Sequence, residues 1–161
     1  MKYFVFVLML FVTNVHAGPC DTDKHKAFDF WQGEWNVFTK DGKLAGTNSL
    51  TKEYGGCVLH ERYQTPNGYR GESLNSYDRT RDVWHQTWVD NGGLLLLLEG
   101  QLIDGEMVLE GSGKSPDGKA VYHRITWTPN PDGTVRQHWQ SATVKDQWQT
   151  AFDGLYRKKA D

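Results

Sequence analysis

Small turn-forming residues recur along this chain at near-regular intervals. The signals are Asp41-Gly42, Gly55-Gly56, Asn67-Gly68, Asn91-Gly92-Gly93, Asp104-Gly105, Asp117-Gly118, Asp132-Gly133 and Asp153-Gly154. Asp-Gly and Asn-Gly supply the positive φ angles that tight hairpins need, and the runs between them, about seven to ten residues, are typical of strands. The spacing therefore predicts a meander of antiparallel hairpins. A long meander hides its free edges by closing into a barrel, and a barrel of this size encloses a cavity.

These turn signals define where the strands are expected. The strand candidates are 34–39, 44–53, 57–65, 70–78, 82–89, 94–100, 106–112, 120–128, 134–142 and 147–157. No proline interrupts a candidate, as expected for a residue that cannot donate to a strand ladder. Residues 21–29 favour a short helix, capped by Asp21 or Thr22, that plugs one end. We predict an all-β fold, a single antiparallel up-and-down barrel of about ten strands.

The first seventeen residues have the pattern of a secretory signal peptide. Lys2 gives a positive start, 3–12 is apolar, and Val15-His16-Ala17 is a small-residue cleavage motif. The apolar run is too short to cross a bilayer core of ~30 Å, and no later run approaches that length. We therefore expect a barrel domain at 18–161 without a transmembrane segment, in the periplasm or secreted.

The two cysteines, Cys20 and Cys57, both lie after the predicted cleavage site. In an oxidising compartment such a pair is most simply a disulfide, and the spacing is not that of a metal site. The formal net charge is -2, with the charges interspersed and no basic stripe. These features predict a disulfide and exclude a nucleic-acid-binding protein.

Strand alternation assigns side chains to faces. The expected inward set is Trp84, Gln86, Trp88, Ile125, Trp127, Val135, Gln137 and Trp139. A buried amide without partners costs about 1–3 kcal/mol. Gln86 and Gln137 therefore either bond each other and nearby polar groups in a packed interior, or face a ligand. Apolar walls with a few convergent polar groups favour a ligand cavity.

This pattern predicts an exported barrel that binds a small hydrophobic or aromatic molecule. The candidate polar anchors are Glu61, Asn75, Gln86, Arg124 and Gln137, and the candidate stacking surfaces are Trp84, Trp88 and Trp139. One alternative is an enzyme acting on such a molecule in the same cavity, which a buried carboxylate of raised pKa facing the cavity would favour. Another is a packed barrel that works through its outer surface.

Catalytic motifs are absent from the sequence. There is no G-x-S-x-G elbow, H-E-x-x-H, P-loop or dinucleotide fingerprint, and no histidine lies two or four residues from another within a predicted strand. We accordingly predict no catalytic residue, no metal ligand and no cofactor.

The segment Phe28-Asp29-Phe30-Trp31-Gln32-Gly33-Glu34-Trp35 resembles the opening of a family of small exported bacterial proteins of unknown function. These proteins begin FDFWxGxW and are grouped with calycin-like barrels. The resemblance extends through 56–57, 74–78, 84–90, 124–129, 135–139 and 152–156. It implies a calycin-like barrel and no particular activity.

Gly33-Glu34-Trp35 is also similar to the G-x-W motif of lipocalins. In that family the tryptophan closes the barrel base under an arginine near the last strand, which implies that Trp35 packs against Arg157. Ten strands without a long C-terminal helix are closer to the fatty-acid-binding and nitrobindin-like barrels. Nitrobindin-like barrels hold haem through a histidine, and the alternative of a haem cofactor would use His123, which shares a face with Ile125 and Trp127.

Overall fold

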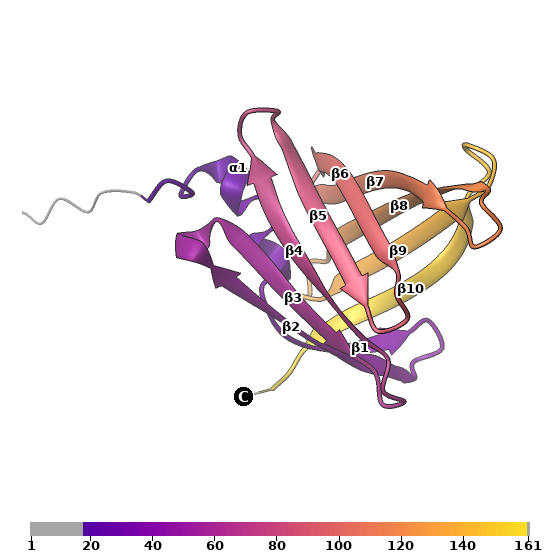
Figure 1. Ribbon diagram of the computed structural model, residues 1–161. Helices are drawn as coiled ribbons and strands as arrows, with labels where there is room; N and C mark the ends of the chain where they lie inside the picture. The colour runs from indigo at the N-terminus through magenta and orange to yellow at the C-terminus, as the bar shows by residue number, and fades with distance from the viewer. Residues whose placement is uncertain (1–17, 161) are drawn as a thin grey trace, which may run out of the picture.

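The computed structural model describes residues 18–160, which form a closed barrel of ten antiparallel strands (Figure 1). A short helix, α1 (Asp23–Lys26), and a 3-10 turn, η1 (Asp29–Trp31), precede the barrel. The strands are β1 (Gly33–Thr39), β2 (Leu44–Glu53), β3 (Val58–Gln64), β4 (Arg70–Asp78), β5 (Val83–Asp90), β6 (Leu95–Ile103), β7 (Glu106–Lys114), β8 (Ala120–Pro129), β9 (Val135–Ala142) and β10 (Gln149–Lys158). Each strand pairs with its neighbours in sequence, and β1 pairs with β10. The predicted fold class is confirmed.

All but one of the predicted turn signals lie between strands. In the β6–β7 hairpin, Asp104 and Gly105 have φ angles of 51° and 86°, as a two-residue turn of two positive φ angles requires. The exception is Asp153-Gly154, which lies inside β10. Asp153 forms an ion pair with Arg136, and a Cβ atom at Gly154 would lie 2.5 Å from the ring of Phe152. This glycine therefore serves packing, not a turn.

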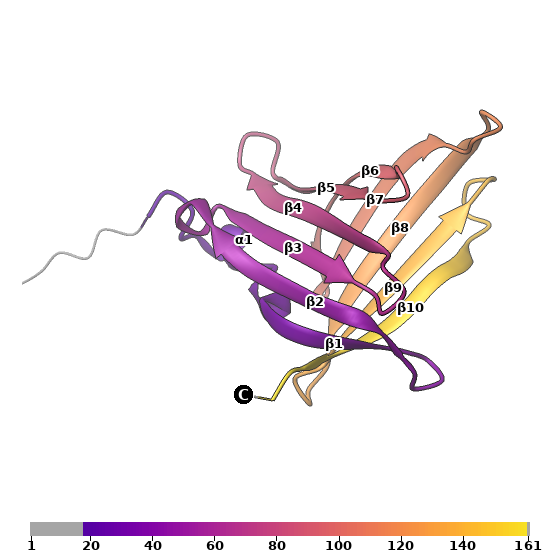
Figure 2. The same ribbon diagram turned by 60° about the horizontal axis from the view of Figure 1, so that its bottom comes forward.

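Aromatic side chains from the N-terminal segment plug one end of the barrel. Phe28 and Trp31 are fully buried, and their stacked ring centroids are 5.0 Å apart. Phe28 lies 5.6 Å from Trp84 and 5.1 Å from Trp127, measured between ring centroids. Figures 1 and 2 show this segment at the end of the barrel away from the β7–β8 and β9–β10 turns. The plug predicted from residues 21–29 thus extends two residues further, to Trp31.

The plug is fastened to the barrel wall. Thr22 caps α1 by accepting a hydrogen bond from the His25 backbone N–H at 3.4 Å, as one of the two predicted caps. The predicted disulfide is present, with Cys20 bonded to Cys57 just before β3. Lys52 in β2 forms an ion pair with Asp29 at 2.5 Å. These contacts hold the residues on both sides of α1 against β2 and β3.

Trp35 is fully buried at this closed end, and its Nε1 donates to the carbonyl of Trp31 at 2.9 Å. The cation over its ring is Lys158, at 5.4 Å, and not the predicted Arg157. The register explains the correction, because Trp35 lies opposite Lys158 while Arg157 lies opposite Asn36. Side chains directly opposite share a face. Arg157 therefore points outward, where its guanidinium lies 5.1 Å from the Phe38 ring centroid.

The predicted signal peptide, residues 1–17, lies outside the described residues. Within 18–160, no helix has both the length and the apolar character needed to cross a membrane.

Candidate functional site

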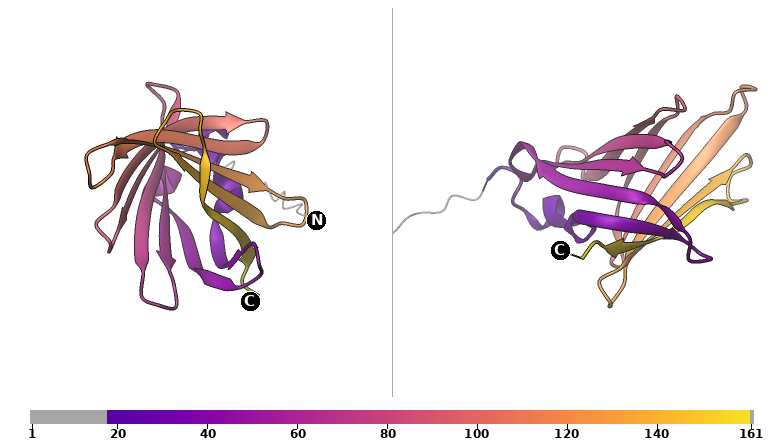
Figure 3. Two further views of the ribbon diagram at one scale, coloured as in Figure 1. Left: turned by 90° about the vertical axis from the view of Figure 1, so that its right-hand side faces the viewer. Right: turned by 90° about the horizontal axis from the view of Figure 1, so that it is seen from below.

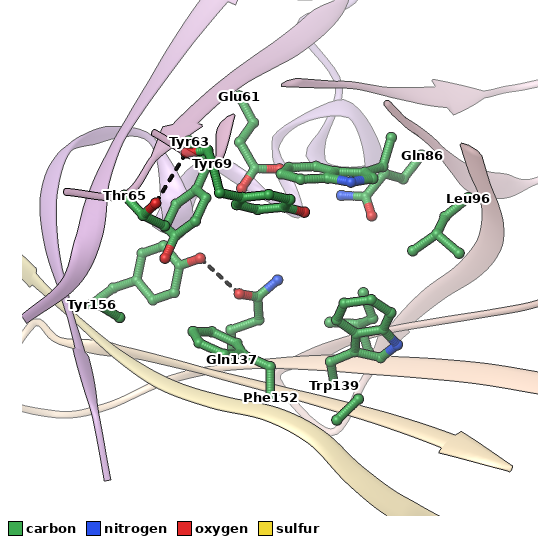
Figure 4. Close-up of a pocket in the computed structure, with 14 residues that line it drawn as sticks. Glu61, Tyr63, Thr65, Tyr69, Gln86, Leu96, Gln137, Trp139, Phe152 and Tyr156 are labelled. Atoms are coloured by element: carbon green, nitrogen blue, oxygen red, sulfur yellow. Dashed lines mark hydrogen bonds between the residues drawn. The ribbon is translucent and has the colours of Figure 1, made fainter. Parts of the chain in front are cut away.

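The half of the barrel away from the plug contains a half-open cavity of about 360 Å³ (Figure 4). Its wall is mainly aromatic and aliphatic, with a few polar side chains. Figure 3 shows the barrel strands in two further views, one from the right-hand side of Figure 1 and one from below. The lining residues are Ala45, Glu61, Tyr63, Thr65, Tyr69, Gln86, Trp88, Leu96, Ile125, Gln137, Trp139, Ala151, Phe152 and Tyr156. A fully packed interior, one of the alternatives considered from the sequence, does not describe this barrel.

Glycines behind the aromatic side chains hold the cavity open. A Cβ atom at Gly71 would lie 2.3 Å from the indole of Trp88, and one at Gly46 would lie 2.8 Å from the ring of Tyr63. Real Cβ atoms do not approach other atoms that closely, so both rings occupy space that only glycine leaves free. The rings consequently lie against the wall.

Two β-bulges set small side chains into the cavity wall. The β1–β2 register shifts between Val37 and Phe38, which leaves Ala45 unpaired, and the β9–β10 register shifts so that Ala151 is unpaired. Bulges of this kind are common next to active sites because they redirect a side chain. Both alanines line the cavity, where they add little volume.

A directed chain of hydrogen bonds fixes Gln86. Asn75 Nδ2 donates to the backbone carbonyl of Leu59 at 3.0 Å, so Asn75 Oδ1 is an acceptor. Gln86 Nε2 donates to that Oδ1 at 2.8 Å. Gln86 Oε1 receives no hydrogen bond from residues 18–160, and Figure 4 shows it on the cavity side. Gln86 therefore belongs to the wall network through its nitrogen and offers its oxygen to the cavity.

Gln137, in β9, is held by a hydrogen bond from the neighbouring strand β10. Tyr156 Oη donates to Gln137 Oε1 at 2.7 Å, and burial raises the pKa of the Tyr156 hydroxyl well above its ordinary value. Gln137 Nε2 makes no hydrogen bond with the described residues and points into the cavity in Figure 4. The two glutamines thus present one acceptor and one donor to the same space.

Glu61 is the only carboxyl group among the lining residues. It is 2 % exposed, and its Oε1 and Oε2 accept hydrogen bonds from Asn48 Nδ2 at 2.7 Å and Ser73 Oγ at 2.6 Å. Burial raises the pKa of Glu61 to about 7, and these two donors only partly oppose the effect. Among residues 18–160, no lysine, arginine or histidine lines the cavity. Glu61 is therefore a carboxyl group that changes charge near neutral pH, in a wall without a cation.

The structure brings five of the eight predicted ligand-binding residues to the cavity: Glu61, Gln86, Trp88, Gln137 and Trp139. Asn75 is fully buried behind Gln86 and does not line it. Trp84 lies at the closed end, where its Nε1 donates to the Lys24 carbonyl at 3.1 Å.

Arg124 lies on the outer face of β8. Its guanidinium pairs with Glu110 at 2.5 Å and lies 4.4 Å from the Trp148 ring centroid. Strand alternation already separates Arg124 from Ile125, which faces the cavity. Arg124 is thus not an anchor inside this cavity.

Several residues that line the cavity are not among the candidate site residues predicted from the sequence. Tyr63 is two residues from Glu61, and the same alternation places it inward. Phe152, Gly154 and Tyr156 follow one another at intervals of two residues in β10, so all three lie on the same face of that strand. Tyr69 lies in the β3–β4 turn, where no periodicity applies; it reaches the cavity because its hydroxyl donates to Asp90 at 2.8 Å.

His123, the residue of the haem alternative, is on the inner face but is not a lining residue of the cavity. Trp139 Nε1 donates to its Nδ1 at 3.2 Å, and burial lowers the pKa of the imidazole. Within residues 18–160 no three His, Cys, Asp or Glu side chains gather as a metal site.

The arrangement suits non-covalent binding of a flat apolar molecule that has a polar edge. The serine nearest Glu61, Ser73, is 1 % exposed and does not line the cavity, so it is not placed to attack a bound molecule. Comparison of the chain with models of known protein families gives no match, and comparison with curated proteins gives none either.

Proposed function

We propose that this protein is an exported binding protein for a small hydrophobic or aromatic molecule, held in the barrel cavity. The observation that carries the proposal is the combination of aromatic walls with unused polar groups. Trp88, Trp139 and Phe152 offer flat apolar surfaces, while Gln86 Oε1 and Gln137 Nε2 have no partner among the described residues. Such polar groups are costly in an apolar cavity unless water or a ligand pairs with them.

Filling the cavity tests the proposal. Leu96 lines the cavity and is 6 % exposed, whereas the next residue, Leu97, is 52 % exposed on the outer face of the same strand. Leu96→Trp sets an indole into the cavity, and Leu97→Trp adds the same indole outside it. Titration with a naphthol, followed by quenching of tryptophan fluorescence, is expected to saturate for the wild type and Leu97→Trp and to fail for Leu96→Trp.

The result that contradicts the proposal is equal binding by both variants, or no saturable binding by any of the three proteins. Mass spectrometry of molecules released from protein purified from its native host identifies the natural ligand. The same experiment tests export, because a mature chain that begins near residue 18 has the mass of residues 18–161 with one disulfide.

A second candidate, an enzyme acting on the same kind of molecule, is favoured by Glu61. A carboxyl group with a pKa of about 7 in a cavity can accept or donate a proton near neutral pH. An enzyme returns an altered molecule, whereas a binding protein returns the molecule unchanged. Chromatography of a bound aromatic compound after long incubation, with Glu61→Gln as the control, distinguishes them.

A further inference from the structure

The charge of the cavity wall indicates the charge of the ligand. Glu61 is the one carboxylic acid among the described lining residues, and none of the other lining residues is a lysine, an arginine or a histidine. A second carboxylate, that of Asp90, lies behind two of the lining residues. It accepts hydrogen bonds from Trp88 Nε1 at 3.2 Å and from the Tyr69 hydroxyl at 2.8 Å. With Glu61 ionised, the cavity has a negative potential that no described basic side chain in its wall offsets.

The hydrogen bonds around Glu61 leave acceptor capacity unused. A carboxylate has about four lone-pair sites, and Glu61 receives one donor on each oxygen. Ser73 Oγ accepts from Asn75 Nδ2 at 2.8 Å, so its own hydrogen is directed at Glu61. Gln86 Oε1, on the same wall, is a further free acceptor. This wall of the cavity therefore requires donors from whatever it holds.

This inference rests on the proposed function. We propose that the ligand is an organic cation that carries a primary or secondary ammonium group on an aromatic or aliphatic body. The ammonium N–H groups donate to the Glu61 carboxylate. The faces of Tyr63, Trp88 and Trp139 pack against the body and attract the positive charge through their π-systems. A carboxylate or phosphate ligand would instead meet like charge, and a neutral ligand would leave Glu61 without a counter-ion.

The protonation of Glu61 makes this binding dependent on pH. The titratable groups that face it are the phenols of Tyr63 and Tyr156, and His60, on the outer face of β3, is the neighbouring basic side chain. Burial raises the pKa of Tyr63 to about 12, and that of Tyr156 also rises, so both stay neutral in the range of interest. An ammonium ligand pairs with the ionised carboxyl group of Glu61, so its binding tightens as the pH rises through about 7. Below that pH Glu61 is mostly protonated, so binding of the ligand releases the proton of Glu61.

Three compounds with one carbon skeleton test the inference: phenylbutylamine, phenylbutanol and phenylbutyrate. Calorimetry at about pH 8 in a buffer without amines is expected to rank the amine first, about ten- to a hundredfold tighter than the alcohol, as for a charge-assisted hydrogen bond. The butyrate is expected to bind most weakly. In Glu61→Gln the amine loses its preference over the alcohol. Glu72→Gln, which removes the same charge from the outer face of β4, retains it.

The outcomes separate this inference from the proposed function. If the alcohol binds as tightly as the amine, or the butyrate binds best, the cation is wrong and the binding protein stands. If no compound binds, both fail. Should Glu61→Gln not fold, the wild type still decides the question. Amine binding at about pH 6 must then release a proton, seen as a dependence of the heat on the buffer, and alcohol binding must not. Equal proton release by both compounds would overturn the inference.

Discussion

Replacing Glu61 with glutamine is expected to reduce the dependence of barrel stability on pH. Gln has nearly the shape of Glu and keeps an oxygen for the donor of Asn48 or Ser73. Its nitrogen needs an acceptor, and Asn48 Oδ1 is a buried oxygen without a hydrogen-bond partner among the described residues. Rotation of the Asn48 amide would turn this oxygen toward the new nitrogen, so that the amide at position 61 keeps a hydrogen bond to Asn48. The substitution therefore removes the ionisation of Glu61 with little change in packing.

The sign of the effect follows from the direction of the pKa shift. In the fold the pKa of Glu61 is about 7, above the ordinary 4.5, so the folded state binds more protons than the unfolded state between these values. The stabilisation from the protonated group is fully present below pH 4.5 and is lost as the pH rises through about 7. The two pKa values differ by about 2.5, and each unit corresponds to about 1.4 kcal/mol. Ionisation of Glu61 therefore costs the wild type about 3 kcal/mol.

Urea unfolding of both proteins at about pH 4.5 and about pH 8.5, without ligand and without amine buffers, measures this quantity. The other carboxylates titrate alike in both proteins, so their contributions cancel in the difference between wild type and Glu61→Gln. That difference is expected to change by about 3 kcal/mol in favour of the variant at the higher pH. Glu72→Gln, whose side chain is 57 % exposed, is expected to show no comparable change. A difference that is the same at both pH values would refute the assignment of a raised pKa to Glu61.

Two further predictions concern how the barrel and its cavity are held. Gly71→Ala puts a Cβ atom 2.3 Å from Trp88 and 2.8 Å from the Val89 carbonyl, so it should displace the indole, lower stability by about 1–3 kcal/mol and weaken naphthol binding; unchanged binding and stability would show that the wall tolerates the Cβ. Reducing the Cys20–Cys57 disulfide, which closes a loop with a sequence separation of 37, should cost about 3–4 kcal/mol of unfolding free energy. An unchanged urea midpoint after reduction would mean that α1 and η1 hold the plug without it.

The sequence alone determined the barrel and the direction of most of its side chains. Turn residues act through local φ and ψ angles, so Asp104-Gly105 specifies a hairpin whatever surrounds it. Strand alternation has a period of two, and it placed Glu61, Gln86 and Gln137 inside without any knowledge of the partner strands. The same alternation separates Arg124 from Ile125, so the sequence held the information that Arg124 faces outward.

Position along the barrel axis, in contrast, depends on closure and on the plug. Trp84 and Trp88 share a face of β5, yet Trp84 packs near Phe28 at the closed end while Trp88 lines the cavity. The pairing of β1 with β10 decides that Lys158 and not Arg157 lies over Trp35. The bulges that bring in Ala45 and Ala151 also depend on the register between strands.

The pKa of Glu61 belongs to the tertiary structure for the same reason. A glutamate in a strand sequence carries no sign of its surroundings, and an ordinary value of 4.5 rises to about 7 only when strands distant in sequence bury it. Tyr156 is 95 residues further along the chain and still faces the same cavity. Local geometry thus fixes which way a side chain points, whereas only closure of the barrel fixes which side chains it meets.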